Sequence, residues 1–142
     1  MKLTISHQEE MRFCATNGTH HVTVDLPAHA GGTNLGMTPP DLFVSALGSC
    51  IGVYVVDYCE MVGIPHEGLR IHLEWKVSER PKRIGKLDAE VELPNATLTD
   101  EQEAGLREAT ERCLLHNTLQ QAPRLSLRLS GVVRPEVMAA AV

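Results

Sequence analysis

The chain has 142 residues, of which 43% are hydrophobic and 22% charged, and its formal net charge is −5. This length predicts a single domain over residues 1–142 that can bury its own hydrophobic core. The acidic balance excludes nucleic acid and anionic membrane surfaces as expected partners, because neither attracts a negatively charged protein. The longest apolar run, residues 42–56, is shorter than the roughly 20 residues of a membrane span, and the N-terminus lacks the apolar centre of a signal peptide. We therefore expect a cytoplasmic protein.

Three short strands are predicted at the start of the chain. Residues 1–6, 11–16 and 20–26 contain the alternation of apolar and polar side chains that is typical of strands. Asn17-Gly18, between the second and third segments, is a strong hairpin signal and makes the group an antiparallel meander. Residues 27–38 contain several glycines without a regular period and are predicted to form a loop.

A long apolar helix is predicted over residues 39–62. Thr38 and Asp41 form a capping box at its start, and Gly63 is the expected left-handed stop at its end. Because residues 42–56 are apolar or small on nearly every face, this helix should be buried all round. A short chain covers so long a helix poorly by itself, so we expect a second subunit to cover part of it.

A hairpin and a second helix are predicted in the next part of the chain. Residues 69–78 and 86–93 alternate as strands on either side of a basic turn at residues 80–85. A second capping box begins at Thr99 and opens a helix that should run to about Leu115.

The C-terminal part completes the predicted fold. Residues 124–133 alternate as a last strand, and residues 135–142 are expected to form a frayed tail. The element order is three strands, a helix, two strands, a helix and a strand. This order predicts an α+β domain whose antiparallel sheets pack on one long buried central helix.

The chain contains four cysteines, which are Cys14, Cys50, Cys59 and Cys113. None is in a C-x-x-C motif, so neither a zinc knuckle nor a thioredoxin-type site is predicted, and inert packing is the ordinary role of a buried thiol. Cys50 stands out because Gly48 and Gly52 flank it inside a helix, where each glycine costs about 1 kcal/mol relative to alanine. These glycines indicate that another backbone or a small ligand packs closely there.

Cys113 is the second cysteine of interest. It is predicted at the C-terminal end of the second helix, where the helix dipole disfavours a thiolate, although Arg112 and His116 can offset that effect. If the second helix packs across the first, Cys50 and Cys113 can meet. Cys59 lies about half a turn out of phase with Cys50 and is predicted to serve only in packing.

No metal or other cofactor is predicted. The seven histidines show no paired spacing on a helix that would suit zinc. The sequence also lacks a P-loop, a dinucleotide-binding fingerprint and a nucleophile elbow.

Two segments resemble the OsmC/Ohr family, the osmotically inducible and organic hydroperoxide resistance proteins. GMTPPDLFVSALGSCIGVYVVDYCEMVGI is similar to the core helix of that family, and RCLLHNTL is similar to its second cysteine motif. The resemblance implies an OsmC-like fold built as an intertwined homodimer with its sites at the subunit interface. It also implies a thiol peroxidase: Cys50 attacks a small hydroperoxide and becomes a sulfenic acid, Cys113 condenses with it to a disulfide, and a dithiol reductant reopens that bond.

The sequence departs from the organic-hydroperoxide branch of the family at two positions. That branch has a glutamate ten residues before the first cysteine, where this chain has Pro40, and a proline after the second cysteine, where this chain has Leu114. These differences favour the general OsmC-like branch. Arg12 is the only arginine ahead of the long helix, and it is therefore the candidate for the cation that stabilises the Cys50 thiolate.

Two other functions agree with the same sequence. The dimer pocket can hold a small apolar ligand while the cysteines merely line it, or the protein can sense redox state by forming the disulfide without turnover. Loss of two thiols per chain after peroxide treatment would favour an enzyme or a sensor, and no loss would favour ligand binding.

Overall fold

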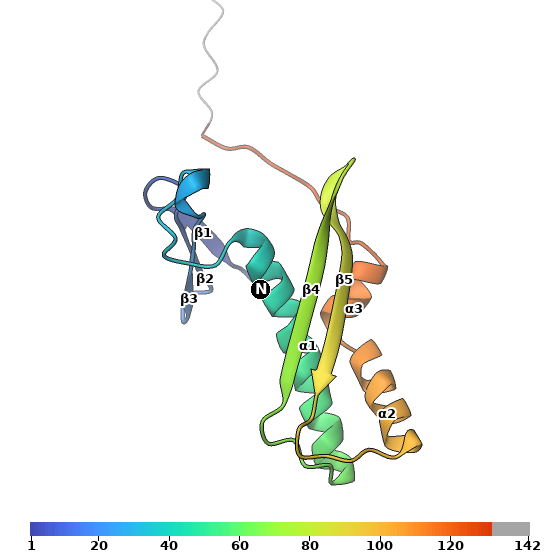
Figure 1. Cartoon of the computed structure of the whole chain (residues 1–142). Helices are drawn as coiled ribbons and strands as arrows, with labels where there is room; N and C mark the ends of the chain where they lie inside the picture. Colours follow the sequence, from blue (N-terminus) through green and yellow to red (C-terminus); the bar gives the residue numbers. More distant parts are fainter. Residues whose placement is uncertain (132–142) are drawn as a thin grey trace, which may run out of the picture.

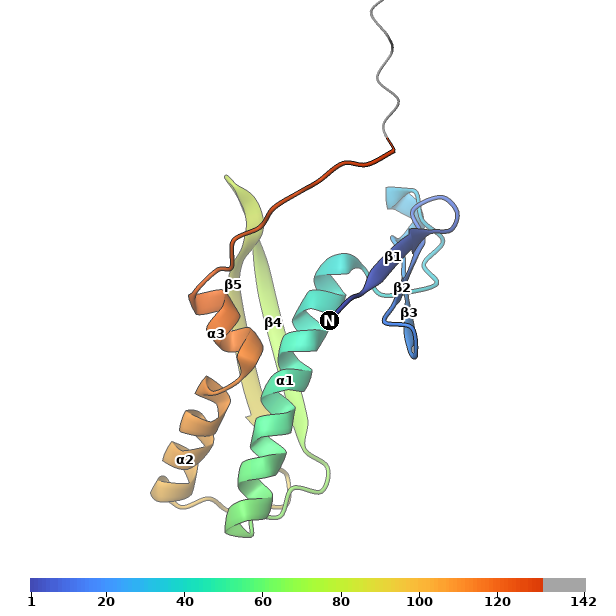
Figure 2. The same ribbon diagram turned by 180° about the vertical axis from the view of Figure 1, so that it is seen from behind.

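The computed structural model describes residues 1–131, so the predicted tail at residues 135–142 lies outside the described part. These residues form an α+β fold of two antiparallel sheets and three α-helices, as predicted (Figure 1). The long helix α1 (Pro39–Val62) packs against β4 (Arg70–Glu79), which pairs with β5 (Lys82–Glu92), and against two shorter helices. These helices are α2 (Asp100–Glu111) and α3 (Leu114–Gln120), which run alongside α1 when the chain is seen from behind (Figure 2).

The end signals of α1 act as the sequence predicts. The Thr38 side chain accepts the Asp41 backbone N–H, and the Asp41 carboxylate accepts the Thr38 backbone N–H at 3.0 Å, which completes the capping box. At the other end, Gly63 adopts φ 74° and its N–H bonds to the Cys59 carbonyl. The predicted bounds of this helix are confirmed.

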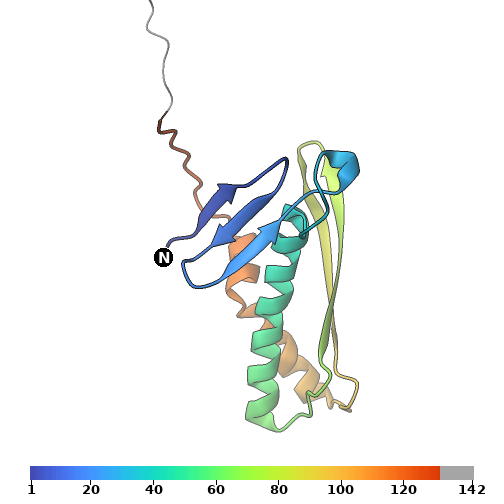
Figure 3. The ribbon, with the colours of Figure 1, turned by 90° about the vertical axis from the view of Figure 1, so that its left-hand side faces the viewer.

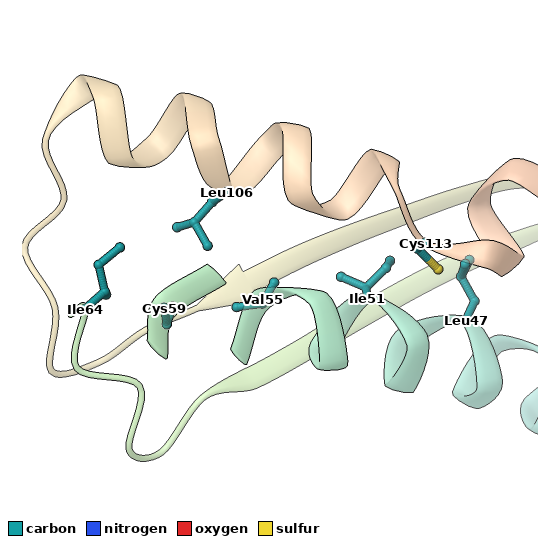
Figure 4. Close-up of a cluster of buried hydrophobic side chains, with 7 residues drawn as sticks. All are labelled: Leu47, Ile51, Val55, Cys59, Ile64, Leu106 and Cys113. Carbon is teal, nitrogen blue, oxygen red and sulfur yellow. The ribbon is translucent and has the colours of Figure 1, made fainter. Parts of the chain in front are cut away.

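The hydrophobic core lies along one side of α1 and extends to α2 (Figure 4). Its buried members are Leu47, Ile51, Val55, Cys59, Ile64, Leu106 and Cys113. Apolar side chains of β4 and β5, including Ile71 and Val91, pack against this cluster. The core therefore joins the two cysteine-bearing segments, since it contains residues of α1 and Cys113, which follows the C-cap of α2.

The glycines that flank Cys50 face β4. A Cβ atom added at Gly48 would collide with the Leu73 side chain, and one added at Gly52 would lie 3.7 Å from Cγ1 of Ile71. The close packing that the sequence predicts at Cys50 is confirmed for Gly48, and the neighbour is a strand of the same chain. This packing fixes the rotation of α1 and with it the direction of the Cys50 side chain.

A single chain covers only part of the α1 surface. Phe43, Val53 and Met61 expose 46%, 67% and 70% of their area, so the helix predicted to be buried all round has an uncovered apolar face here. Within residues 1–131, α1 is the one helix that could cross a membrane by length and composition alone. It packs against β4, α2 and α3 along one side.

The N-terminal sheet consists of β1 (Thr4–His7), β2 (Phe13–Thr16) and β3 (His21–Val24), paired antiparallel in chain order. Figure 3 shows it beside the N-terminal half of α1. Ile5, Ala15 and Val22 are register partners and lie on one apolar face of the sheet. Ile5 and Val22 remain 55% and 46% exposed, so the described part of this chain leaves this face largely uncovered.

The hairpin of β4 and β5 is longer than predicted. Glu79 pairs with Lys82, so Arg80 and Pro81 alone form the turn, and the predicted basic turn at residues 80–85 is wrong. The register shifts between Lys76 and Val77. This irregularity interrupts the alternation of apolar and polar residues, and it explains why periodicity located the start of the second strand too late.

The last predicted strand does not form where the structure describes it. Residues 124–131 have no strand partner, and residues 132–133 lie outside the described part. Leucine and polar residues do alternate in this segment, but Leu125, Leu127 and Leu129 expose 93%, 85% and 79% of their area. Within the described residues this segment pairs with neither of the two sheets, so the predicted strand is wrong over residues 124–131.

The loop before α1 is organised by the buried carboxylate of Asp25. The carboxylate accepts the Thr33 hydroxyl at 2.6 Å and the backbone N–H groups of Leu26, Thr33 and Leu35 at 2.8, 3.1 and 3.1 Å. The Thr33 hydroxyl contributes most, and together these bonds lower the pKa of Asp25 to about 2. The sequence predicts a loop here but not the side chain that orders it.

Asp25→Asn is expected to lower the melting temperature by roughly 5 °C at pH 7. The folded pKa of about 2 lies below the ordinary 3.8, so the carboxylate stabilises the fold above about pH 4 and loses this effect as the pH falls toward 2. Thermal unfolding of both proteins between pH 7 and pH 2 measures the difference, which should shrink steadily on acidification. A difference that is independent of pH would contradict the role of the charge.

Candidate active site

Cys50 and Cys113 lie side by side. Cys50 is in the middle of α1, and its side chain lies close enough to that of Cys113, between α2 and α3, for each thiol to shift the pKa of the other. In Figure 4 the Cys113 sulfur is directed toward α1, next to Leu47. Cys113 is fully buried, whereas Cys50 is partly exposed, and both are free thiols. Solvent can therefore reach Cys50 but not Cys113.

The helix predicted to run to Leu115 breaks at Cys113. α2 ends at Glu111, and α3 begins at Leu114 with Cys113 as its N-cap. The Cys113 sulfur accepts the His116 backbone N–H at 3.5 Å. Cys113 therefore lies just past the C-terminal end of α2, as predicted, and it also precedes the first turn of α3, where free N–H groups gather. No glycine or proline marks this break in the sequence.

The surroundings of the pair lower the pKa of one thiol and raise that of the other. Burial is the largest influence on Cys50 and raises its pKa, but hydrogen bonds from the Cys113 side chain and from the Leu115 and Leu114 backbone amides outweigh it, so the net pKa is lowered. Burial, together with the neighbouring Cys50, raises the pKa of Cys113. Cys50 therefore loses its proton first, and Cys113 keeps a proton that it donates to the Cys50 thiolate.

Arg12 lies elsewhere in this chain. It forms an ion pair with Glu9 and donates a hydrogen bond to the Thr33 hydroxyl at 3.3 Å. It is not among the groups that shift the pKa of Cys50. The structure therefore brings together two of the three predicted site residues and leaves Arg12 with the N-terminal sheet. The amide donors of Leu114 and Leu115 are the thiolate-stabilising groups that sequence reasoning missed.

The other two cysteines are separate from this pair. Cys59 is fully buried in the core, and that burial raises the pKa of its thiol, which suits the packing role predicted for it. Cys14 lies in β2 opposite Ser6 and Thr23. Among residues 1–131, no group of three His, Cys, Asp or Glu side chains is placed to hold a metal ion.

An apolar groove lies on the same side of α1 as Cys50. It has a volume of about 710 Å³, and Phe43, Leu87 and Leu119 line it together with residues at the start of α1. Phe43 is seven residues before Cys50, which places both on one face of the helix. The groove therefore offers apolar space two turns from the more reactive thiol.

Replacing Cys113 by alanine is expected to raise the pKa of Cys50, because the variant loses the side-chain hydrogen bond that favours the thiolate. Alkylation of Cys50 by iodoacetamide, followed by mass spectrometry from pH 5 to pH 10, measures the midpoint. The midpoint should move to higher pH in this variant and stay in place in Cys59→Ala. A midpoint that is unchanged or lower in Cys113→Ala would contradict the proposed hydrogen bond.

Comparison with known proteins gives one family. The family model for OsmC-like protein matches residues 31–128. No curated protein sequence matches the chain significantly.

Solved structures share the fold. A Psychrobacter arcticus protein assigned to osmotic stress and the detoxification response is 17% identical over 83% of this chain and 87% of that one, with a TM-score of 0.74. The OsmC-like protein of Mycoplasma pneumoniae is 21% identical over 85% and 87%, with a TM-score of 0.67. The organic hydroperoxide resistance protein OsmC of Legionella pneumophila is 18% identical over 85% and 90%, with a TM-score of 0.61.

Proposed function

Because the chain belongs to the OsmC-like family, we propose that it is a cysteine-based hydroperoxide reductase that removes peroxides in the cytoplasm. The family includes peroxiredoxin-like redox proteins, and its members are typically soluble. One observation carries the proposal: a partly exposed thiol of lowered pKa, Cys50, lies against a buried thiol of raised pKa, Cys113. This asymmetry suits a nucleophile and the thiol that resolves its oxidised form.

The proposed reaction has two oxidative steps and one reductive step. The Cys50 thiolate attacks the terminal oxygen of a hydroperoxide, the O–O bond breaks, and the alkoxide leaves as an alcohol after taking up a proton. Cys50 is then a sulfenic acid. The Cys113 sulfur attacks the Cys50 sulfur, and the hydroxyl group leaves with the Cys113 proton as water, which forms a disulfide. A dithiol reductant then returns both thiols by two exchange reactions and becomes a disulfide itself.

The uncovered apolar surfaces support a homodimer. One face of the N-terminal sheet and part of α1 are exposed in a single chain, and contiguous apolar surface of this kind is characteristic of interaction sites. Arg12 belongs to the proposed site as a cation that reaches Cys50 across this dimer, since the two are not brought together within one chain. Sedimentation should show a species of twice the chain mass of 15.6 kDa at micromolar concentration, and a stable monomer would contradict the dimer.

Peroxide consumption with dithiothreitol as reductant tests the proposed function. We expect continuous consumption of an alkyl hydroperoxide and loss of two thiols per chain when the reductant is withheld. Loss of two thiols without turnover would identify a redox sensor. No loss of thiols would identify a protein that binds small apolar ligands, with the groove along Phe43 as the candidate site.

A further inference from the structure

The free backbone amides at the start of α3 face sulfur atoms. The first turn of any helix has N–H groups without a partner in the helix. In α3 the His116 amide donates a hydrogen bond to the Cys113 sulfur at 3.5 Å, and the Leu114 and Leu115 amides lie close enough to the Cys50 sulfur to lower the pKa of its thiol. The next amide, that of Asn117, already has the Cys113 carbonyl at 3.0 Å. The start of α3 is therefore held by the two cysteines.

Few other contacts hold α3 in place. The helix has seven residues and none of them is fully buried, although Leu115 packs against the core and Leu119 lines the apolar groove. Helices this short are unstable in water without tertiary support. Residues 121–131 continue from its end without regular structure, so no later element of the described chain anchors it. The stability of α3 thus depends on these apolar contacts and on the acceptor strength of the sulfur atoms at its start.

Forming a disulfide changes that acceptor strength. The Cys50 thiolate and the Cys113 thiol give up two electrons and one proton to the oxidant, and the Cys50 sulfur becomes one end of a neutral S–S bond. A neutral sulfur is a weak acceptor. The Cys113 sulfur must also move from hydrogen-bond distance to bonding distance from Cys50, away from its place as the cap of α3.

We infer that forming the Cys50–Cys113 disulfide releases α3 and thereby opens the disulfide to the dithiol reductant. The inference rests on the proposed function, in which a hydroperoxide is the natural oxidant and a dithiol must reduce the disulfide. Exchange is faster when the reductant attacks Cys113 and expels Cys50, the thiol of lower pKa, and Cys113 is fully buried while α3 is in place. Leu119 and Gln120 also line the apolar groove, so release of α3 removes one of its walls and frees the alcohol product.

Hydrogen–deuterium exchange tests the release directly. Diamide, which oxidises thiol pairs without any peroxidase chemistry, is used to form the disulfide. We expect the amides of Leu114–Gln120 to exchange roughly tenfold faster or more in the oxidised protein, while those in the middle of α1 keep their rates. Cys113→Ser provides the control, because serine retains a capping oxygen and cannot form the bond. Its α3 amides should not respond to diamide.

Two variants on α3 test whether release of this helix speeds reduction of the disulfide. Asn117 is exposed, and its side chain makes no hydrogen bond in the described structure. Asn117→Ala strengthens the helix and Asn117→Gly weakens it, so reduction of the disulfide by dithiothreitol should be roughly fivefold faster in the glycine variant than in the alanine variant. Equal rates would overturn the claim that release of α3 admits the reductant.

The outcomes separate this inference from the proposed function. A disulfide formed by diamide that leaves α3 exchange unchanged would overturn the inference and leave the peroxidase proposal intact. Faster exchange after diamide, in a protein that peroxide does not oxidise, would support the release of α3 and count against the peroxidase. Failure of diamide to link Cys50 and Cys113 would overturn the inference.

Discussion

Replacing Cys50 by serine is expected to abolish dithiol-dependent peroxide reduction, with a loss of at least about 1000-fold. A serine hydroxyl cannot replace a thiolate, because its pKa is far too high for the Cys113 and α3 amide hydrogen bonds to ionise it. The measurement is the steady-state rate of alkyl hydroperoxide loss with dithiothreitol.

The matched control is Cys59→Ser, nine residues along the same helix. Cys59 is fully buried in the core, and its thiol has a raised pKa, so the rate should stay within about twofold of wild type for the folded protein. The melting temperature reports any packing loss separately. Equal losses of activity in the two variants, with both proteins folded, would mean that Cys50 is not the nucleophile.

Replacing Cys113 by serine is expected to stop the reaction after one turnover. Cys50 still reacts with peroxide, and the serine oxygen can still cap α3, but no thiol is present to convert the sulfenic acid to a disulfide. Each chain should consume one equivalent of peroxide rapidly, and the steady-state rate should then fall roughly tenfold or more. Rapid mixing with limiting dithiothreitol resolves the two phases. An unchanged steady-state rate would show that Cys113 does not resolve the intermediate.

Local signals in the sequence were sufficient where an element is determined by its own ends. The bounds of α1 follow from the Thr38–Asp41 capping box and from Gly63, and both signals act in the structure as they do in isolated helices. The N-terminal meander follows from Asn17-Gly18 and the alternation on either side. The two cysteine motifs likewise pointed to Cys50 and Cys113, which the structure brings into contact.

Tertiary contacts decided what the sequence did not reveal. The break between α2 and α3 depends on a cysteine acting as an N-cap, a role that the sequence pattern around Cys113 does not indicate. The donors that lower the pKa of Cys50 come from that break, so sequence reasoning looked for a cation and chose Arg12. The strand predicted over residues 124–133 illustrates the same limit, because alternation shows that a segment can pair but not which strand it would pair with.

The most direct test of the central claim is to map the thiols after one equivalent of alkyl hydroperoxide per chain. Alkylation and digestion without reductant, followed by mass spectrometry, identify which cysteines are linked. The account predicts one disulfide, between the peptides that contain Cys50 and Cys113, with Cys14 and Cys59 alkylated as free thiols. Four free thiols after peroxide, or a disulfide that includes Cys59, would contradict it.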